Sequence, residues 1–206
     1  SNRMGIRYQP EPDLFYKTVT ERVDTFFNSN KRSQQANVWF YLKSALLISS
    51  YALCYYAIYS CSKVSFAILA MSCMGPLAIL IGINVAHDAA HNAISSKQWI
   101  NRSFLYLFDA LGANSYMWKN RHVFSHHSFP NILNEDADLK QHPLVRIFPT
   151  DVLRKIHKYQ FIYAPFLYLL YTINWLYFRD FKDFRAEKIG SLENQRHQTK
   201  EWIKLF

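Results

Sequence analysis

The chain has 206 residues, of which 50% are apolar and 17% aromatic, and its formal net charge is +9. This composition excludes a disordered chain and a collagen, and the length allows one domain or a little more. A basic chain suggests nucleic acid or an anionic membrane surface as its partner. Because the sequence has no recognisable nucleic-acid motif, we favour the membrane and expect no nucleic-acid partner. The three cysteines lack metal-type spacing, so we expect no disulfide framework.

Two long apolar runs follow a polar, basic segment at residues 1–37. The runs, 38–59 and 64–86, each have the length that a helix needs to cross a bilayer core of about 30 Å. The short link between them fits a tight hairpin, and Lys43 lies near the basic end, where it can extend to the interface. The alternative, a soluble protein with two buried core helices, fits less well because such helices are usually shorter. The sequence therefore predicts an all-α integral membrane protein that begins with a helical hairpin.

Basic residues are distributed unevenly around this hairpin. Six Lys or Arg precede the first run, only Lys63 lies in the link, and many follow the second run. The positive-inside rule therefore places both ends of the hairpin in the cytoplasm. We divide the chain into a basic cytoplasmic segment (1–37), a two-span hairpin (38–86) and a cytoplasmic and interfacial helical region (87–206).

The later apolar runs are shorter or interrupted. The run 104–118 contains Asp109 and is too short and polar to span, so we expect a packed or interfacial helix. The run 161–178 has eight aromatic residues and is interrupted by Pro165 and Asn174. Aromatic residues concentrate at membrane interfaces, so we expect this run to lie on the cytoplasmic face rather than to span. The last 28 residues are polar, and we expect them to be helical.

Five of the eight histidines fall into two clusters. The first is His87-Asp88-Ala89-Ala90-His91, and the second contains His122, His126 and His127. Residues i and i+4 share a helix face, so each cluster can direct two imidazoles at one metal. In an α-helix His127 would be turned about 100° from His126, so the second cluster can offer imidazoles to two metals.

Packing five imidazoles together without a metal would charge or desolvate them at a cost of several kcal/mol. A metal removes this conflict because it takes neutral imidazole as a ligand. The sequence lacks the H-E-x-x-H motif, which disfavours an intramembrane zinc protease. We expect the isolated histidines, His142, His157 and His197, to lie at the surface.

The first cluster, followed by Trp118-Lys119-Asn120-Arg121-His122 and His126-His127, resembles the histidine boxes of the membrane fatty acid desaturases. The resemblance is closer to bacterial acyl-lipid desaturases, including front-end types. It covers about residues 35–206 and extends through 131–138 and 181–184. It implies a di-iron enzyme that uses O₂ to introduce a double bond into an acyl chain. The iron ligands that it implies are His87, His91, His122, His126 and His127.

The resemblance also implies an acyl lipid or acyl thioester substrate and a separate electron donor of the ferredoxin or cytochrome b5 type. It favours a bacterial inner membrane over the endoplasmic reticulum. Asp88 either accepts a hydrogen bond from a ligating imidazole or is a solvated acid at a helix end. The polar residues after the second cluster either orient ligands or form a polar loop: Asn131, Glu135, Asp136 and Asp138.

One feature of the family is missing. The family has a third box, usually H/Q-x-x-H-H, and no such pattern follows His127. We therefore expect the N-terminal part of a desaturase, which alone would be inactive. The alternatives are a related di-iron lipid hydroxylase and a non-catalytic truncated membrane remnant.

Overall fold

The computed structural model describes residues 13–139, 143–190, 192–194 and 197–205. The residues expected to form the start of the basic segment (1–12) and His142 lie outside these ranges. The regular secondary structure of the described residues is helical except for one two-stranded ribbon, which confirms the all-α fold class. It forms two compact units, Ser1–Phe104 and Leu105–Phe206, each of which is described by itself. The division into 1–37, 38–86 and 87–206 stays a prediction.

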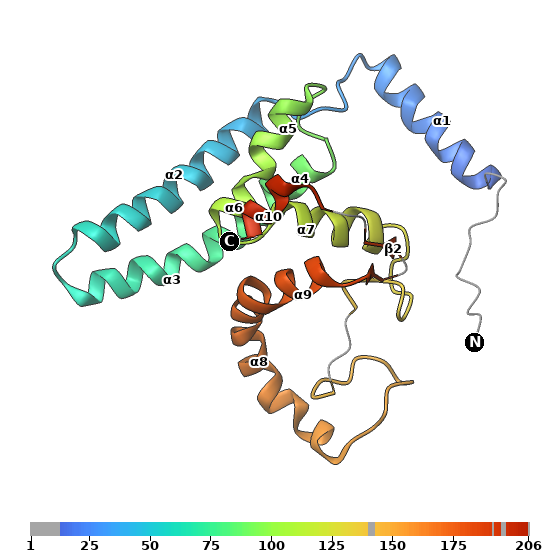
Figure 1. The fold of residues 1–206 in the computed structure, drawn as a ribbon. Helices are drawn as coiled ribbons and strands as arrows, with labels where there is room; N and C mark the ends of the chain where they lie inside the picture. The colour runs from blue at the N-terminus through green and yellow to red at the C-terminus, as the bar shows by residue number, and fades with distance from the viewer. Residues whose placement is uncertain (1–12, 140–142, 191, 195–196, 206) are drawn as a thin grey trace. The chain divides into compact units, whose positions relative to one another are not determined.

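The first unit is built around a helical hairpin. Its elements are α1 (Leu14–Ser29), α2 (Val38–Ser60), α3 (Val64–Ile81), the π-helical segment η1 (Gly82–Ala86), α4 (His87–Ala90) and α5 (Gln98–Leu105). The Asn37 side chain caps α2 by accepting a hydrogen bond from the Phe40 backbone N–H. Helices α2 and α3 lie side by side in opposite directions (Figure 1), as the two apolar runs and their short link predicted.

Lys43 has a partner across this hairpin. Its ammonium group donates a hydrogen bond of 3.1 Å to the side-chain oxygen of Asn84, which lies in η1. Asn84 in turn donates to the Leu80 backbone oxygen. The charge inside the first apolar run is therefore satisfied by a neighbouring helix rather than by reaching out to the interface.

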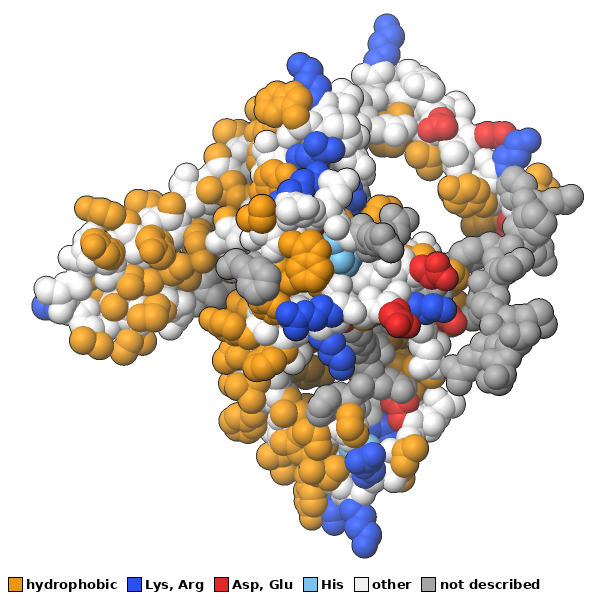
Figure 2. All heavy atoms as spheres, in the orientation of Figure 1, with side chains coloured by type: hydrophobic (Ala, Val, Ile, Leu, Met, Phe, Trp, Pro, Cys, Tyr) orange, Lys and Arg blue, Asp and Glu red, His pale blue; other side chains and the backbone are white. Residues whose placement is uncertain are grey.

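Three helices in the described residues are long and apolar enough to cross a membrane: Val38–Ser60, Val64–Ala90 and Lys155–Arg185. Many of their apolar side chains are exposed, and hydrophobic side chains cover the visible face of the α2–α3 hairpin (Figure 2). Apolar surface of this extent is unfavourable in water and favourable in lipid, as expected for a membrane protein. The third helix includes the run 161–178, whose placement at the interface stays a prediction.

The second unit consists of short elements. They are α6 (Leu107–Ala110), α7 (Ser115–Lys119), the π-helical segment η2 (Asn120–His126), the 3₁₀-helix η3 (Lys155–Tyr159), α8 (Gln160–Asn174), the π-helical segment η4 (Trp175–Arg179), α9 (Asp180–Arg185), β1 (Lys188–Ile189), β2 (Leu192–Glu193) and α10 (Thr199–Leu205). The prediction of one helix over 104–118 is wrong. Gly112 has a φ of 92°, and Asn114 caps a new helix at Ser115. The helix predicted for the last residues is interrupted by the antiparallel ribbon β1–β2.

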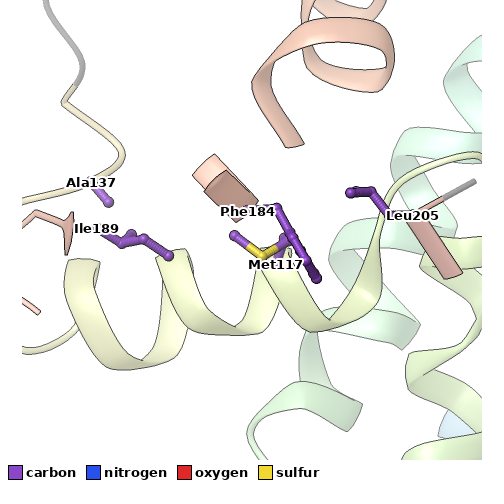
Figure 3. Close-up of a cluster of buried hydrophobic side chains, with 5 residues drawn as sticks. All are labelled: Met117, Ala137, Phe184, Ile189 and Leu205. Carbon is purple, nitrogen blue, oxygen red and sulfur yellow. The ribbon is translucent and has the colours of Figure 1, made fainter. Parts of the chain in front are cut away.

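A small apolar core joins the C-terminal elements of this unit to α7. It consists of Met117, Ala137, Phe184, Ile189 and Leu205 (Figure 3). These residues come from α7, the loop after η2, α9, β1 and α10. Because Met117 lies one turn before the second histidine cluster, this core fixes the helix that carries the cluster.

His197 belongs to this packed region, so its predicted surface position is wrong. Its Nε2 donates to the Phe184 backbone oxygen at 2.8 Å, and its Nδ1 accepts from the Tyr116 hydroxyl at 3.0 Å. The imidazole and Phe184 ring centres are 3.8 Å apart. Because both of its nitrogens are hydrogen-bonded, His197 connects the segment just before α10 to α9 and to the start of α7.

Replacement of Gly190 by Ala is expected to destabilise the second unit by about 2 kcal/mol or more. Gly190 has a φ of 60°, and a Cβ atom there would overlap the Glu135 backbone oxygen and lie 2.6 Å from Ser125 Oγ. The measurement is chemical unfolding of the detergent-solubilised protein. Gly75→Ala is the control, since a Cβ at Gly75 meets nothing within 4 Å. Equal stability of the two variants would contradict this packing.

Candidate metal centre

The first histidine pair follows the π-helical segment η1. The His87 backbone N–H donates to the Gly82 oxygen, five residues back. The His87 and His91 rings lie with centres 4.7 Å apart, as the i, i+4 spacing predicted. The Asp88 carboxylate lies 3.4 Å from His87 Nδ1, so of the two interpretations of Asp88 the structure supports contact with an imidazole.

The second cluster lies on a π-helix, and this changes which histidines face each other. The His127 backbone N–H donates to the His122 oxygen at 3.0 Å, which is the i→i+5 bond of a π-helix. His122 Nε2 and His127 Nε2 are 3.1 Å apart. The His122 ring centre is 4.6 Å from that of His127 and 5.4 Å from that of His126. The α-helical prediction that His127 turns away is therefore wrong, because a π-helix brings residues i and i+5 to one face.

Two carboxylates contact the other side of these imidazoles. His126 Nδ1 lies 2.8 Å from Asp136 Oδ2, and His122 Nδ1 lies 3.4 Å from Asp138 Oδ2. Asp136 also accepts backbone N–H groups of Asn131 and Asp138, at 2.9 and 2.8 Å. A carboxylate that holds the Nδ1 proton leaves Nε2 with a lone pair for a metal. The loop after the cluster therefore orients imidazoles, which the sequence left open.

Both carboxylates are held in the ionised form. Burial raises the pKa of Asp136, but hydrogen bonds from the Asn131 backbone and the His126 side chain outweigh it and lower the pKa below its ordinary value. Burial also raises the pKa of Asp138, and here the His122 hydrogen bond and the Arg179 charge bring the pKa down. At neutral pH both groups can therefore accept hydrogen bonds from imidazole N–H groups.

Arg179, at the end of η4, holds the second carboxylate in place. One of its nitrogens donates to the Ala137 backbone oxygen at 2.9 Å and to Asp138 Oδ1 at 3.3 Å. Its Nε lies 3.7 Å from the carboxylate of Asp183. Arg179 therefore connects the helix after the aromatic run to the carboxylate that contacts His122.

Arg121, next to His122, forms a buried ion pair with two carboxylates of α9. Its guanidinium lies 2.6 Å from Asp180 Oδ1 and 3.1 Å from Asp183 Oδ2, and all three side chains are at most 4% exposed. Asp180 also accepts from the Asn114 backbone N–H and the Trp175 indole N–H. Sequence reasoning missed this arrangement. Its signal was two acids three residues apart after an apolar run, with an arginine inside the histidine motif.

Aromatic stacking restricts the His122 ring further. Trp118 stacks on His122 with ring centres 4.4 Å apart, and Phe108 stacks on Trp118 with ring centres 4.3 Å apart. Stacking and the Asp138 contact together fix the plane and the direction of the ring.

These residues suit a transition metal. His122, His126 and Asp138 each bring one ligand atom within 4.8 Å of the others. Neutral imidazole is a ligand that iron, zinc, copper and nickel all accept, and the Asp136 and Asp138 contacts favour the neutral tautomer that carries its lone pair on Nε2. His87 and His91 belong to the first unit, and the other three box histidines belong to the second.

Together, the apolar helical hairpin and the carboxylate-oriented histidine clusters define a membrane protein of the histidine-box class. The chain belongs to the fatty acid desaturase family, whose model matches residues 62–206.

Three relatives illustrate the similarity. The chain is 33% identical to an acyl-lipid (8-3)-desaturase of Physcomitrium patens, over 89% of this chain and 39% of that protein. It is 33% identical to an sn-1 linoleoyl-lipid 6-desaturase of Synechocystis, over 78% of this chain and 45% of the relative. A probable Delta(5) fatty acid desaturase C of Dictyostelium discoideum is also 33% identical, over 87% of this chain and 40% of that protein. The chain thus spans less than half the length of these relatives. No solved structure is significantly similar to it.

Proposed function

We propose that the complete protein is an acyl-lipid desaturase that uses O₂ to introduce a double bond into an acyl chain. Membership of the family and the desaturase activities for which the relatives are named support this activity. The observation that carries it is the convergence of His122 and His127 through their Nε2 atoms, 3.1 Å apart, in a cluster where carboxylates contact Nδ1 of His122 and His126. Such an arrangement is built to hold a metal rather than to fill a core.

We assign the five box histidines as iron ligands: His87, His91, His122, His126 and His127. Iron held by them would supply the O₂ activation needed to remove hydrogen from an unactivated methylene. Asp136 and Asp138 keep the protons of His126 and His122 on Nδ1, so that Nε2 faces the metal. Asp88 has the corresponding role for His87.

The remaining assignments concern substrate, donor and location. The substrate is an acyl lipid rather than an acyl thioester, which the lipid-specific names of several relatives support. Electrons come from a separate ferredoxin or cytochrome b5. The active face is cytoplasmic, because basic residues flank both ends of the hairpin. The membrane is a bacterial inner membrane, which the similarity to the Synechocystis protein supports.

The test is production of the full-length protein that contains this chain, in a host with a suitable electron donor, followed by mass spectrometry of the lipids. We expect a product two hydrogens lighter than its precursor, and we expect it to vanish in His122→Ala and His126→Ala variants that still insert into the membrane. Lys182→Ala, at an exposed position of α9, is the control and should keep activity.

Other products would identify the alternatives. A product heavier by one oxygen would indicate the related lipid hydroxylase. Unchanged lipids, with normal insertion and an active donor, would support the non-catalytic remnant and contradict the proposal.

A further inference from the structure

A second candidate site lies in the second unit, between the loop that starts at Pro143 and the beginning of α8. It is an open cavity of about 630 Å³. Four of the side chains that line it are basic and two are exposed apolar ones: Arg146, Arg154, Lys155, Lys158, Leu153 and Phe161. None of the box histidines lines it, and no acidic side chain does so among the described residues. The cavity is therefore a concentrated positive site that the proposed chemistry does not use.

The walls of this cavity are held together by side chains that replace missing backbone partners. The Gln160 amide accepts from the Arg146 backbone N–H at 2.8 Å and donates to the Arg146 oxygen at 3.0 Å. Tyr163 donates to the Leu144 oxygen at 2.6 Å. His157 accepts from the Arg154 backbone N–H and donates to the Pro143 oxygen, both at 3.1 Å. His157 is thus half-buried rather than at the surface, and the loop is fixed to the helix before any ligand binds.

One of the four basic side chains is hydrogen-bonded into the wall of the cavity, and the other three are exposed. The Arg146 guanidinium donates to the backbone oxygens of Asp151 and Pro149, so it forms part of the wall. Arg154, Lys155 and Lys158 are exposed. Three exposed cations around one cavity attract an anion, and a phosphate offers several oxygens that can accept from them at once.

Apolar side chains beside these cations indicate where the anion comes from. Leu153 and Phe161, both on the cavity, are 72% and 78% exposed, and the adjacent Val152 is 77% exposed. Figure 2 shows basic side chains among hydrophobic ones over the start of α8. Exposed apolar side chains do not stabilise the binding of a free anion. At a membrane surface they can lie among the acyl chains, while the neighbouring cations lie at the level of the lipid phosphates.

We infer that this cavity binds the phosphate of an anionic phospholipid, with Arg154, Lys155 and Lys158 contacting the headgroup and Leu153 and Phe161 lying among the upper acyl carbons. Lipid binding requires no metal, O₂ or turnover. Its test therefore succeeds or fails independently of the proposed desaturase function.

The experiment compares lipid retention by the purified 206-residue protein in neutral detergent doped with phosphatidylglycerol or phosphatidylcholine, measured by native mass spectrometry. The variant carries Arg154→Gln, Lys155→Gln and Lys158→Gln together. We expect its affinity for phosphatidylglycerol to fall by about tenfold, because three cations that attract the anionic headgroup are removed and salt screens part of that attraction. Phosphatidylcholine retention should change little.

A matched control removes the same charge elsewhere in the same unit, through Lys182→Gln, Arg185→Gln and Lys188→Gln at exposed positions. This control should retain phosphatidylglycerol within about twofold of the parent protein. Equal losses in both variants would show diffuse attraction and overturn the site. Displacement of the lipid by inorganic phosphate alone, or by coenzyme A at equal concentration, would also overturn it in favour of a soluble phosphate ligand.

Discussion

Replacement of Arg121 by Met is expected to destabilise the second unit by about 3–5 kcal/mol, because it leaves two buried carboxylates without their cation. Asp180 and Asp183 are at most 4% exposed and lie within 3.1 Å of the Arg121 guanidinium. Methionine fills similar space but supplies no charge and no donor. The measurement is chemical unfolding of the detergent-solubilised protein, followed by the fluorescence of its tryptophans. Trp175 is a suitable probe, since its indole contacts Asp180.

A rescue experiment separates the charge effect from the loss of packing. Adding Asp180→Asn and Asp183→Asn to Arg121→Met removes the uncompensated charges. The single amide oxygen at position 180 can still accept from one of the two donors, the Asn114 backbone N–H or the Trp175 indole N–H, which contact different oxygens of Asp180. We expect the triple variant to recover at least half of the lost stability. A single variant as stable as the parent protein, or a triple variant less stable than the single one, would contradict the role given to this ion pair.

Replacement of Asp136 by Asn is expected to weaken metal binding at the second histidine cluster by about 10- to 100-fold. The substitution keeps the shape of the side chain but removes the negative charge beside His126 Nδ1, which lies 2.8 Å away. The imidazole then loses both its fixed tautomer and part of its basicity. Titration of the protein with Co²⁺, followed by visible absorption, measures the affinity directly and needs neither substrate nor electron donor.

The neighbouring carboxylate gives a graded comparison. Asp138 is more exposed and lies farther from its imidazole, at 3.4 Å, so Asp138→Asn should have a smaller effect than Asp136→Asn. Glu187→Gln, an exposed change in the same unit, is the control and should bind Co²⁺ as the parent protein does. The reverse order, or unchanged affinity in Asp136→Asn, would show that these carboxylates do not support the metal ligands.

The long elements of this protein could be predicted from its sequence because their cause is local. Two apolar runs of membrane length, joined by a few polar residues, have few alternatives to a hairpin, and α2 and α3 occupy them. The candidate ligands were also visible, since histidine clusters of this kind have few other uses. What they contact could not be predicted, because the acids that orient them lie 10 and 16 residues farther along the chain.

Other features depended on tertiary structure or on helix type. His197 was expected at the surface, yet Tyr116 and Phe184 surround it from distant positions. The sequence pattern does not distinguish a buried ion pair, such as that of Arg121 with Asp180 and Asp183, from solvent-exposed charges, because both have the same local composition. The expectation that His127 turns about 100° away from His126 failed because nothing in residues 120–126 distinguishes a π-helix from an α-helix.

The π-helix at 120–126 also affects how this segment responds to a change in length. A π-helical turn contains one residue more than an α-helical turn, so removing any single residue between His122 and His127 would allow the segment to return to an α-helix. The two imidazoles would then be four residues apart and would still share a helix face, so the direction of His127 relative to His122 would change little. Deletion of Val123 or Phe124 is therefore expected to disturb the chain after it less than a deletion inside an α-helix, where every later side chain rotates by about 100°.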